Sequence, residues 1–385
     1  MTLQQQVRGV LERAVQNHEI AGASVLVRQH GKELLFETAG YADVAAGKPI
    51  RRDSIFRLYS QSKPITAAAV MLLEQRGLID LTEGVDRYLP GFAHPMMFTP
   101  EGVKSAPRAP WIYELLAMTA GCSYPDIDGA GQHAARVFEE DHRLIEQGGG
   151  MTTQELCNRL GACPLAFAPG KQFRYSTCAD ILGAVVEVVS GKSYGDFLRE
   201  ELFEPLGMKD TAFWVPEEKR ERLVTCYERV PGDVKPWQGL HLAVGDYTRQ
   251  PAFESGGAGL VSTLDDYAAF AQMLLGGGVY NGRRILSETA VDSMTRAQVD
   301  DGFAGTWEHL RGYGYGRLMR ICTDPGKVTG FARLGEYGWD GWLGTYFANI
   351  PSNDMTILFM TNAKDSGTLP VTRKVRNVVL GGVCD

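Results

Sequence analysis

A serine and a lysine three positions apart, Ser60 and Lys63, are the residues of this 385-residue chain whose types and spacing best suit catalysis. The alanine- and leucine-rich stretch that follows predicts a helix over residues 63–76, with Pro64 in its first turn and Gly77 as its stop. Residues three apart on a helix share a face, so the lysine amine is expected beside the serine hydroxyl. A serine is a weak nucleophile without an adjacent base, and Lys63 serves as that base only if burial lowers its pKa by about 3 units. Taken alone, the pattern also fits a helix cap with a solvated lysine.

A tyrosine and a glycine-containing segment farther along the chain add groups that such a nucleophile needs. Tyr175 precedes a predicted helix, and a tyrosine near a lysine ammonium is easier to ionise, so the two are suited to moving a proton between nucleophile and leaving group. Residues 339–345 lie where one predicted strand meets the next, and Gly341 leaves room there for a substrate carbonyl. The backbone N–H groups of Trp342 and Ser60 would then form an oxyanion hole. The alternatives are a tyrosine packed at a helix entry and a tight glycine turn in a hairpin.

Hydrophobic periodicity predicts an α/β fold, in which an antiparallel sheet is flanked by helices and carries an inserted, mainly helical domain. The chain opens with an amphipathic helix and a hairpin of residues 23–28 and 34–38, and we expect this hairpin to lie beside the late strands. Those strands are predicted at residues 331–337, 343–350 and 355–361, and helices at residues 153–160, 180–190, 194–203, 264–275 and 371–380. We therefore expect one sheet domain from residues 1–80 and 255–385, a mainly helical domain from residues 81–254, and the active site between them.

Together these segments resemble the serine β-lactamase and penicillin-binding-protein superfamily, and within it the class C β-lactamase-like branch that includes family VIII carboxylesterases. The resemblance covers nearly the whole chain and rests on residues 56–66, 114–121, 167–175, 203–208 and 256–263. It implies that Ser60 is the nucleophile, Lys63 its base and Tyr175 the partner acid/base, with the N–H groups of Ser60 and Trp342 at the oxyanion. We expect no cofactor and no metal. Ser62 is a decoy, because two residues separate Ser60 from Lys63 and none separates Ser62 from it.

Two departures from the family pattern bear on the substrate. Trp339 stands where the β-lactamases have the lysine of Lys-Thr-Gly, and Thr177 stands where an asparagine is usual, so a cation and an amide contact are missing. Asp340 would further oppose anionic substrates. We take Thr177, Trp339, Asp340 and Gly341 as candidate substrate-binding residues and expect a carboxylesterase or transesterase that forms an acyl-enzyme on Ser60. A β-lactamase or D-alanyl-D-alanine carboxypeptidase/D-aminopeptidase, and a non-catalytic binding or scaffold protein on the same fold, remain alternatives.

The composition argues against several classes of partner and location. The formal net charge is -7 and the basic residues are scattered, so nucleic acid is not an expected partner. The first residues do not read as a secretory signal, no apolar run is long enough to span a membrane, and the seven cysteines include no C-x-x-C pair. We therefore expect reduced thiols, a cytoplasmic location, and a small ester, amide or lactam as the partner, with the oligomeric state open. No G-x-S-x-G, H-E-x-x-H or P-loop motif occurs.

Overall fold

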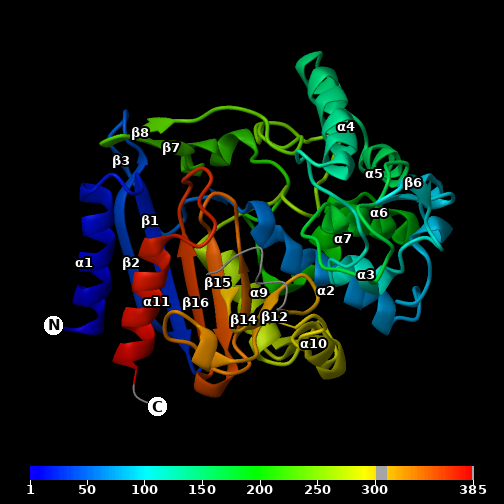
Figure 1. Ribbon diagram of the computed structural model, residues 1–385. Helices are drawn as coiled ribbons and strands as arrows, with labels where there is room; N and C mark the ends of the chain where they lie inside the picture. The colour runs from blue at the N-terminus through cyan, green and yellow to red at the C-terminus, as the bar shows by residue number, and fades with distance from the viewer. Residues whose placement is uncertain (301–309, 384–385) are drawn as a thin grey trace.

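An antiparallel sheet drawn from both ends of the chain forms the central layer of the computed structural model, which describes residues 1–300 and 310–383 (Figure 1). Within these residues the sheet has eight strands in the order β12-β13-β14-β15-β16-β1-β2-β3. Its strands are β1 (Gly22–Gln29), β2 (Lys32–Asp43), β3 (Lys48–Pro49), β12 (Tyr313–Tyr315), β13 (Arg320–Cys322), β14 (Tyr337–Asp340), β15 (Tyr346–Ile350) and β16 (Met355–Met360). In β1, Leu26 lies opposite Phe36 of β2 on one side and Leu358 of β16 on the other. The expected placement of the first hairpin beside the late strands is confirmed.

Helices cover both faces of this sheet and also form a separate group beside it (Figure 1). The helices are α1 (Leu3–Gln16), α2 (Lys63–Gln75), α3 (Ile112–Leu116), α4 (Gly129–Glu146), α5 (Thr153–Gly161), α6 (Cys178–Ser190), α7 (Tyr194–Leu198), α8 (Glu204–Leu206), α9 (Leu264–Leu275), α10 (Glu288–Met294) and α11 (Pro370–Gly382). The first and last helices, α1 and α11, lie side by side on one face, and α9 packs on the other. The predicted α/β fold class, an antiparallel sheet flanked by helices, is confirmed.

Strand β1 shows why the sheet needs cover on both faces. Successive side chains of a strand point to opposite faces. Val25 and Val27 pack in one hydrophobic cluster with α1 and α11, whereas Leu26 belongs to the other cluster with Phe270 of α9. An uninterrupted apolar run in the sequence therefore corresponds to a strand that is buried between two layers of helices.

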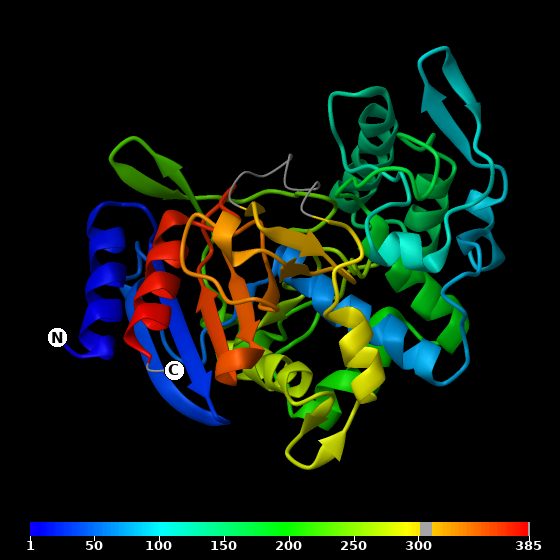
Figure 2. The same ribbon diagram turned by 60° about the horizontal axis from the view of Figure 1, so that its bottom comes forward.

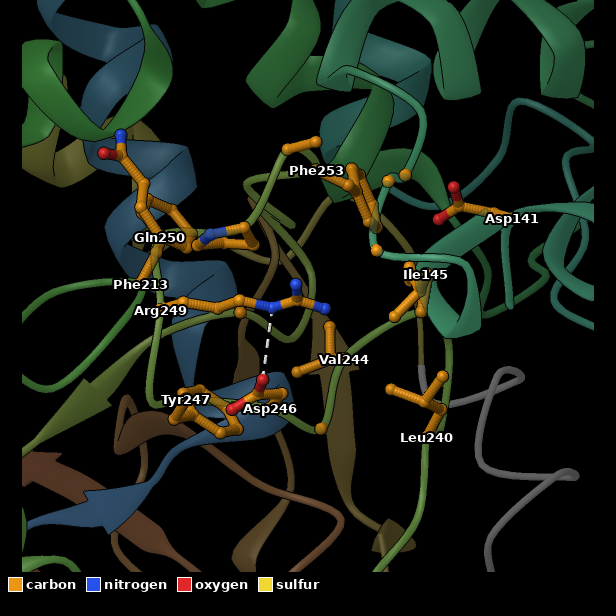
Figure 3. A pocket seen from close by; sticks show the side chains of 18 residues that line it. Asp141, Ile145, Phe213, Leu240, Val244, Asp246, Tyr247, Arg249, Gln250 and Phe253 are labelled. Carbon is orange, nitrogen blue, oxygen red and sulfur yellow. Dashed lines mark ion pairs between the residues drawn. The ribbon is translucent and has the colours of Figure 1, made fainter. Parts of the chain in front are cut away.

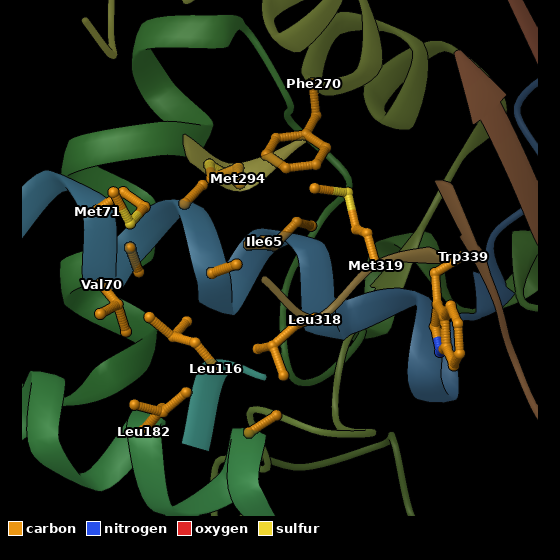
Figure 4. Packing of buried hydrophobic residues seen from close by; sticks show 14 of the residues in the cluster. Ile65, Val70, Met71, Leu116, Leu182, Phe270, Met294, Leu318, Met319 and Trp339 are labelled. Atoms are coloured by element: carbon orange, nitrogen blue, oxygen red, sulfur yellow. The ribbon is translucent and has the colours of Figure 1, made fainter. Parts of the chain in front are cut away.

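Helix α2 runs through the core and carries the candidate nucleophile at its start. All of its residues from Lys63 to Leu73 are buried, which is typical of a helix that is enclosed on every side. Figure 4 shows this packing, in which side chains of α2 meet residues of other helices and of the chain before β13: Ile65, Val70, Met71, Leu116, Leu182, Phe270, Met294, Leu318 and Met319. Strand β14, which contributes Trp339 to the same cluster, contacts the beginning of the helix. The N-terminal end of α2 is therefore held in place by dense packing.

The middle of the chain forms the group of helices farthest from α1 and α11 in both ribbon views (Figures 1 and 2). Two hairpins in the middle of the chain were not predicted from the sequence patterns. They are β5 (Met96–Thr99) with β6 (Gly102–Ser105), beside these helices, and β7 (Tyr227–Val230) with β8 (Asp233–Pro236), on the side of β3 and α1. Further short pairs are β4 (Phe56–Arg57) with β9 (Val261–Ser262) and β10 (Val279–Tyr280) with β11 (Arg283–Arg284). The division into domains at residues 80 and 254 stays a prediction.

Two of the predicted late strands begin later than expected. The strand predicted over residues 331–337 is β14, which starts only at Tyr337, because the chain turns at Gly335, where φ is +77°, and only Gly335 and Glu336 bond to Cys322 of the neighbouring strand. Phe331 ahead of that turn remains 57% exposed, so its apolar character does not mark a buried strand. The strand predicted over residues 343–350 starts at Tyr346, since a tight turn occupies the residues before it. The helix predicted over residues 194–203 is confirmed as α7 followed by a π-helical turn, Arg199–Phe203.

None of the helices in the described part of the chain combines the length and the apolar character that crossing a membrane requires. Within the same residues, no group of three or more His, Cys, Asp or Glu side chains gathers in a way that would hold a metal ion.

A substitution within α2 tests how far the protein depends on this helix. Leu72 is 1% exposed, and we expect Leu72→Ala to lower the free energy of unfolding by about 2–5 kcal/mol, because the lost side chain leaves a cavity. Leu78, just beyond the helix, is 54% exposed and serves as the matched control, with an expected change within about 0.5 kcal/mol for Leu78→Ala. Urea denaturation followed by circular dichroism measures both. Equal losses for the two variants would contradict the described packing of α2.

Candidate active site

Ser60 lies in a 3₁₀ turn, Tyr59–Ser62, that leads directly into α2. Pro64 occupies the first turn of the helix, where its missing N–H costs no helical hydrogen bond. Tyr59, the residue before the serine, has φ +46°, a left-handed conformation that is strained for a bulky side chain. Such strain is found at functional sites, where the surrounding structure enforces it. The turn places Ser60 Oγ 3.0 Å from Lys63 Nζ.

The amine of Lys63 is fully buried and has three hydrogen-bond partners. Besides Ser60 Oγ, Nζ lies 3.0 Å from Tyr124 Oη and 2.8 Å from the carbonyl oxygen of Gly257. Burial lowers the pKa of Lys63 to about 7, although the negative charge of Asp180 acts in the opposite direction. Since the Gly257 carbonyl can only accept, it holds one N–H of the amine, and the neutral amine has a lone pair left for the serine hydroxyl. Near neutral pH, this lysine is therefore able to act as a base.

The carbonyl that holds Lys63 is itself held by a buried carboxylate. Asp180 Oδ1 accepts hydrogen bonds from Gly257 N, at 2.9 Å, and from Ser255 Oγ. Burial raises the pKa of Asp180, while the charge of Lys63 acts to lower it. A side chain at position 257 would bring its Cβ within 2.8 Å of the Asp180 carboxylate, so the segment requires glycine there. Asp180 thus fixes the acceptor that orients the lysine.

Tyr175 lies above the lysine and reaches the serine. Lys63 Nζ is 4.7 Å from the centre of the Tyr175 ring, and the phenol is hydrogen-bonded to Ser60 and to Trp339 Nε1, the latter at 3.1 Å. The expectation that this tyrosine ionises easily is not met, because burial raises its pKa, and the hydrogen bonds from Ser60 and Trp339 offset only part of that effect. Tyr175 therefore remains a protonated hydroxyl that is placed to pass a proton on rather than to act as the initial base.

A second tyrosine, Tyr124, lies beside the lysine, and the sequence did not identify it as a group that could exchange protons with Lys63. Tyr124 Oη contacts Lys63 Nζ, burial raises the pKa of its phenol, and its ring lies 5.8 Å from that of Tyr175. The two phenols flank the amine. The only signal in the sequence was its position, three residues after Gly121 at the end of a segment that resembles the family.

The turn after β14 brings the third predicted segment to the serine. Gly341 N donates to Thr345 O at 2.8 Å, and a side chain on Gly341 would place its Cβ 2.1 Å from the carbonyl oxygen of Leu58. Only glycine allows this close approach to the segment before Ser60. As a result, Ser60 and Trp342 face one cavity of about 380 Å³.

This cavity is lined by aromatic rings, hydroxyls and two carboxylates. Its lining residues are Ser60, Tyr175, Leu310, Trp339, Asp340, Gly341, Trp342, Asp365, Ser366, Gly367 and Thr368. None of these described residues is basic. The carboxylate of Asp340 accepts a hydrogen bond from Thr368 Oγ1, and Asp365 Oδ1 accepts one from Trp342 Nε1 at 2.8 Å. The cavity therefore offers negative charge and aromatic surface to a ligand.

Two residues from the sequence reasoning lie outside this arrangement. Thr177 is buried, its hydroxyl lies 3.4 Å from the carbonyl oxygen of Ser123, and it is not among the residues that line the cavity. Ser62 is also buried, and its Oγ accepts a hydrogen bond from Leu260 N at 3.2 Å, away from the Lys63 amine. The structure thus brings together Ser60, Lys63 and Tyr175, whereas the contribution of Thr177 to substrate binding stays a prediction.

Comparisons with known proteins show what this chain is similar to. A family model described as Beta-lactamase matches residues 7–379. Esterase EstB of Burkholderia gladioli is 30% identical over 96% of this chain and 93% of its own length, and penicillin-binding protein 4* of Bacillus subtilis (strain 168) is 30% identical over 92% and 71%. Among solved structures, EstCE1, described as a hydrolase with promiscuous acyltransferase activity, superposes with a TM-score of 0.85 and 26% identity, covering 98% of each chain.

The lowered pKa of Lys63 predicts a pH profile for the reactivity of Ser60. Because the amine must be neutral to take the serine proton, we expect the rate of phosphonylation by a fluorophosphonate to fall about tenfold per pH unit below about 7 and to level off above it. Labelling rates between pH 5 and 9, read by intact mass, give the profile.

The variant Asp180→Asn provides a second test of Lys63 as the base. Since the charge of Asp180 raises the pKa of Lys63, its removal should move the midpoint of the profile to lower pH. A rate that is independent of pH in the wild type, or a midpoint that moves upward in this variant, would contradict Lys63 as the base.

Proposed function

Since this chain belongs to the Beta-lactamase family and is a serine hydrolase of that family, we propose that it cleaves neutral carboxylic esters through an acyl-enzyme on Ser60. The single observation that carries the proposal is the contact of Ser60 Oγ with the buried amine of Lys63, whose pKa is about 7. A serine hydroxyl beside an uncharged amine is an activated nucleophile. The small-molecule ester is the partner that we propose.

In the acylation step that we propose, Ser60 Oγ forms a bond to the acyl carbon as Lys63 takes the hydroxyl proton. The oxyanion that develops accepts hydrogen bonds from the N–H groups of Ser60 and Trp342, which each contribute about 3 kcal/mol at such sites. When the bond to the alcohol oxygen breaks, the proton passes from Lys63 by way of the Tyr175 hydroxyl to the departing alkoxide. The alcohol leaves, and the acyl group remains on Ser60.

Deacylation repeats these transfers with a new nucleophile. Water adds to the acyl carbon while its proton moves to Lys63, the bond to Ser60 Oγ breaks, and Ser60 regains its proton as the carboxylic acid leaves. An alcohol in place of water gives an exchanged ester. The description of EstCE1 as a hydrolase with acyltransferase activity supports this second outcome, so we propose hydrolysis and transesterification at one site.

The preference for neutral esters rests on the missing cation. Trp339 stands where the related β-lactamases have a lysine for the substrate carboxylate, and its indole N–H is engaged with Tyr175. Asp340 and Asp365 face the cavity, and none of its described lining residues is basic. A carboxylate-bearing substrate would meet the repulsion of these carboxylates, which is offset only in part by Lys364, whose Nζ lies 3.6 Å from Asp365 Oδ2. The 30% identity to esterase EstB supports an ester, while the equal identity to a penicillin-binding protein keeps a lactam or D-alanyl peptide as the second candidate.

The cellular location that we propose is the cytoplasm. Cys122, Cys157, Cys163, Cys178, Cys226 and Cys322 are free, which suits a reducing compartment. Cys384 lies outside the described residues.

Substitution of the two neighbouring serines tests the assignment of the nucleophile. We expect Ser60→Ala to reduce turnover of p-nitrophenyl butyrate by at least about 1,000-fold, since no acyl-enzyme forms. Ser62→Ala is the matched control, and it should keep kcat/KM within about fivefold while losing roughly 1–3 kcal/mol of stability with its buried hydrogen bond. Intact-mass detection of the acyl adduct accompanies the kinetics. The reverse pattern would refute the assignment, and failure of both folded proteins to label with a fluorophosphonate would favour a non-catalytic protein.

Three substrates of different charge and bond type test the preference. We expect p-nitrophenyl butyrate to be cleaved with a kcat/KM about tenfold higher than p-nitrophenyl hemisuccinate, which carries a carboxylate, and about 100-fold higher than nitrocefin. Asp365→Asn removes one negative charge from the cavity. It should lower the ratio of kcat/KM for the butyrate ester to kcat/KM for the hemisuccinate by a few-fold. Faster turnover of nitrocefin or of a D-alanyl-D-alanine peptide than of the butyrate ester would make the second candidate the better description.

A further inference from the structure

The indole of Trp342 is held from several sides by residues far apart in the sequence. The ring of His241 stacks on it with centres 4.0 Å apart and planes 14° apart. Trp237 packs edge-on at 5.3 Å, and Tyr59, the residue before the nucleophile, lies at 4.9 Å. The indole N–H donates to Asp365 Oδ1 at 2.8 Å. We call His241, Trp237 and Tyr59 the aromatic clamp of Trp342.

The clamp acts on the residue that is central to the proposed oxyanion hole. The backbone oxygen of Trp342 accepts a hydrogen bond from Ser366 N at 2.9 Å, in the same loop that holds the indole N–H. The aromatic clamp contacts the faces and edges of the indole and so limits how the ring can tilt. Because the indole is attached to Cα, rings that fix its position also limit how far the backbone at Trp342 can shift or tilt.

We propose that His241 is a positioning residue for Trp342, and that its stacked ring keeps the Trp342 N–H directed at the substrate oxyanion. This inference rests on the proposed function and adds His241 to it. His241 precedes Trp342 by about 100 residues and does not line the cavity beside Ser60. The stacked contact favours one orientation of the indole, because two flat rings in contact attract each other beyond the area that they bury.

The turn that carries His241 is strained. His241 N donates to Val244 O at 2.9 Å and Val244 N to His241 O at 3.1 Å, which closes a two-residue turn. The two residues inside it, Leu242 and Ala243, have φ values of +56° and +58°, in the left-handed region that favours glycine. A turn of this kind without glycine persists only when outside contacts enforce it.

The turn is held by hydrophobic packing and by two specific contacts, and the chain around it borders a cavity. Figure 3 shows Leu240 and Val244 beside this cavity, which has a volume of about 250 Å³ and is bordered across from them by Ile145 of α4. Ser60 and Lys63 do not line it. Ala243 and Val244 also pack in hydrophobic clusters, and the turn is further fixed by the stack of His241 with Trp342 and by the hydrogen bond from Ala243 N to His142 Nε2, at 3.0 Å.

The imidazole of His241 is neutral under ordinary conditions. Burial lowers the pKa of His241 to about 4, with the charge of Asp365 acting in the opposite direction. At neutral pH, the ring therefore stacks on the indole as an uncharged plane, and another flat uncharged ring can replace it. His241 therefore positions the indole through the stacked contact of its ring and not through a charge.

Kinetics of two variants test the proposal. We expect His241→Ala to lower kcat for p-nitrophenyl butyrate about tenfold with KM changed less than about threefold, because a misdirected oxyanion donor weakens the transition state more than the bound ester. His241→Phe keeps a flat ring and should restore kcat to within about threefold of the wild type. His94→Ala removes an exposed histidine elsewhere and should leave both constants unchanged. If His241→Ala keeps the kcat of the wild type, or if His241→Phe loses as much as His241→Ala, the proposal is wrong.

A spectroscopic measurement separates this proposal from the proposed function. Acrylamide quenching of Trp342 fluorescence, taken as the difference between each protein and its Trp342→Phe counterpart, should rise at least about twofold in His241→Ala and stay near the wild-type value in His241→Phe. This reading requires no substrate. If the wild type cleaves no ester but the variants show this pattern of quenching, the proposed function is contradicted and the role of His241 in positioning Trp342 is supported. Unchanged quenching in folded His241→Ala would end the clamp, whatever the enzyme cleaves.

Discussion

The removal of one amine from water is the constraint on which the site depends. Lys63 is fully buried, and burial is what lowers its pKa to about 7. Such a group is tolerated only if its polar atoms are satisfied, and Ser60, Tyr124 and the carbonyl of Gly257 provide three partners. The same burial raises the pKa of the nearby tyrosines, so the hydrophobic surroundings favour the neutral form of both the lysine amine and the phenols.

The fold serves this constraint by enclosing the helix that carries the lysine. Helix α2 is buried along nearly its whole length, and the segment with Gly257 is anchored to α6 through Asp180. Two glycines allow the close approaches that the site needs, Gly257 beside the carboxylate of Asp180 and Gly341 beside the chain ahead of Ser60. The replacement of a cation by Trp339 then changes the character of the cavity without disturbing the base, because the indole N–H bonds to Tyr175.

Regular elements with strong periodicity were predictable, and irregular ones were not. The helix at residues 264–275 and the hairpin at the start of the chain follow from local patterns of apolar residues. Phe331 and the two residues after it have strand-like composition but lie outside the sheet, ahead of the turn at Gly335, and only the pairing in the sheet could reveal this. The two unpredicted hairpins of the middle region are formed by half-buried or exposed residues, in which apolar alternation is weak.

The sequence by itself determined the nucleophile segment, the family and the order of the elements, because residues a few positions apart on one helix turn must meet in any fold that contains that turn. The tertiary structure alone decided which distant groups complete the site. Tyr124 contacts Lys63, Asp180 holds the Gly257 segment against Lys63, and His241 stacks on Trp342, each across roughly 60 to 120 residues of sequence. The physical reason is that desolvation and ring packing depend on the whole set of neighbours around a side chain, and the chain brings those neighbours together only when it folds.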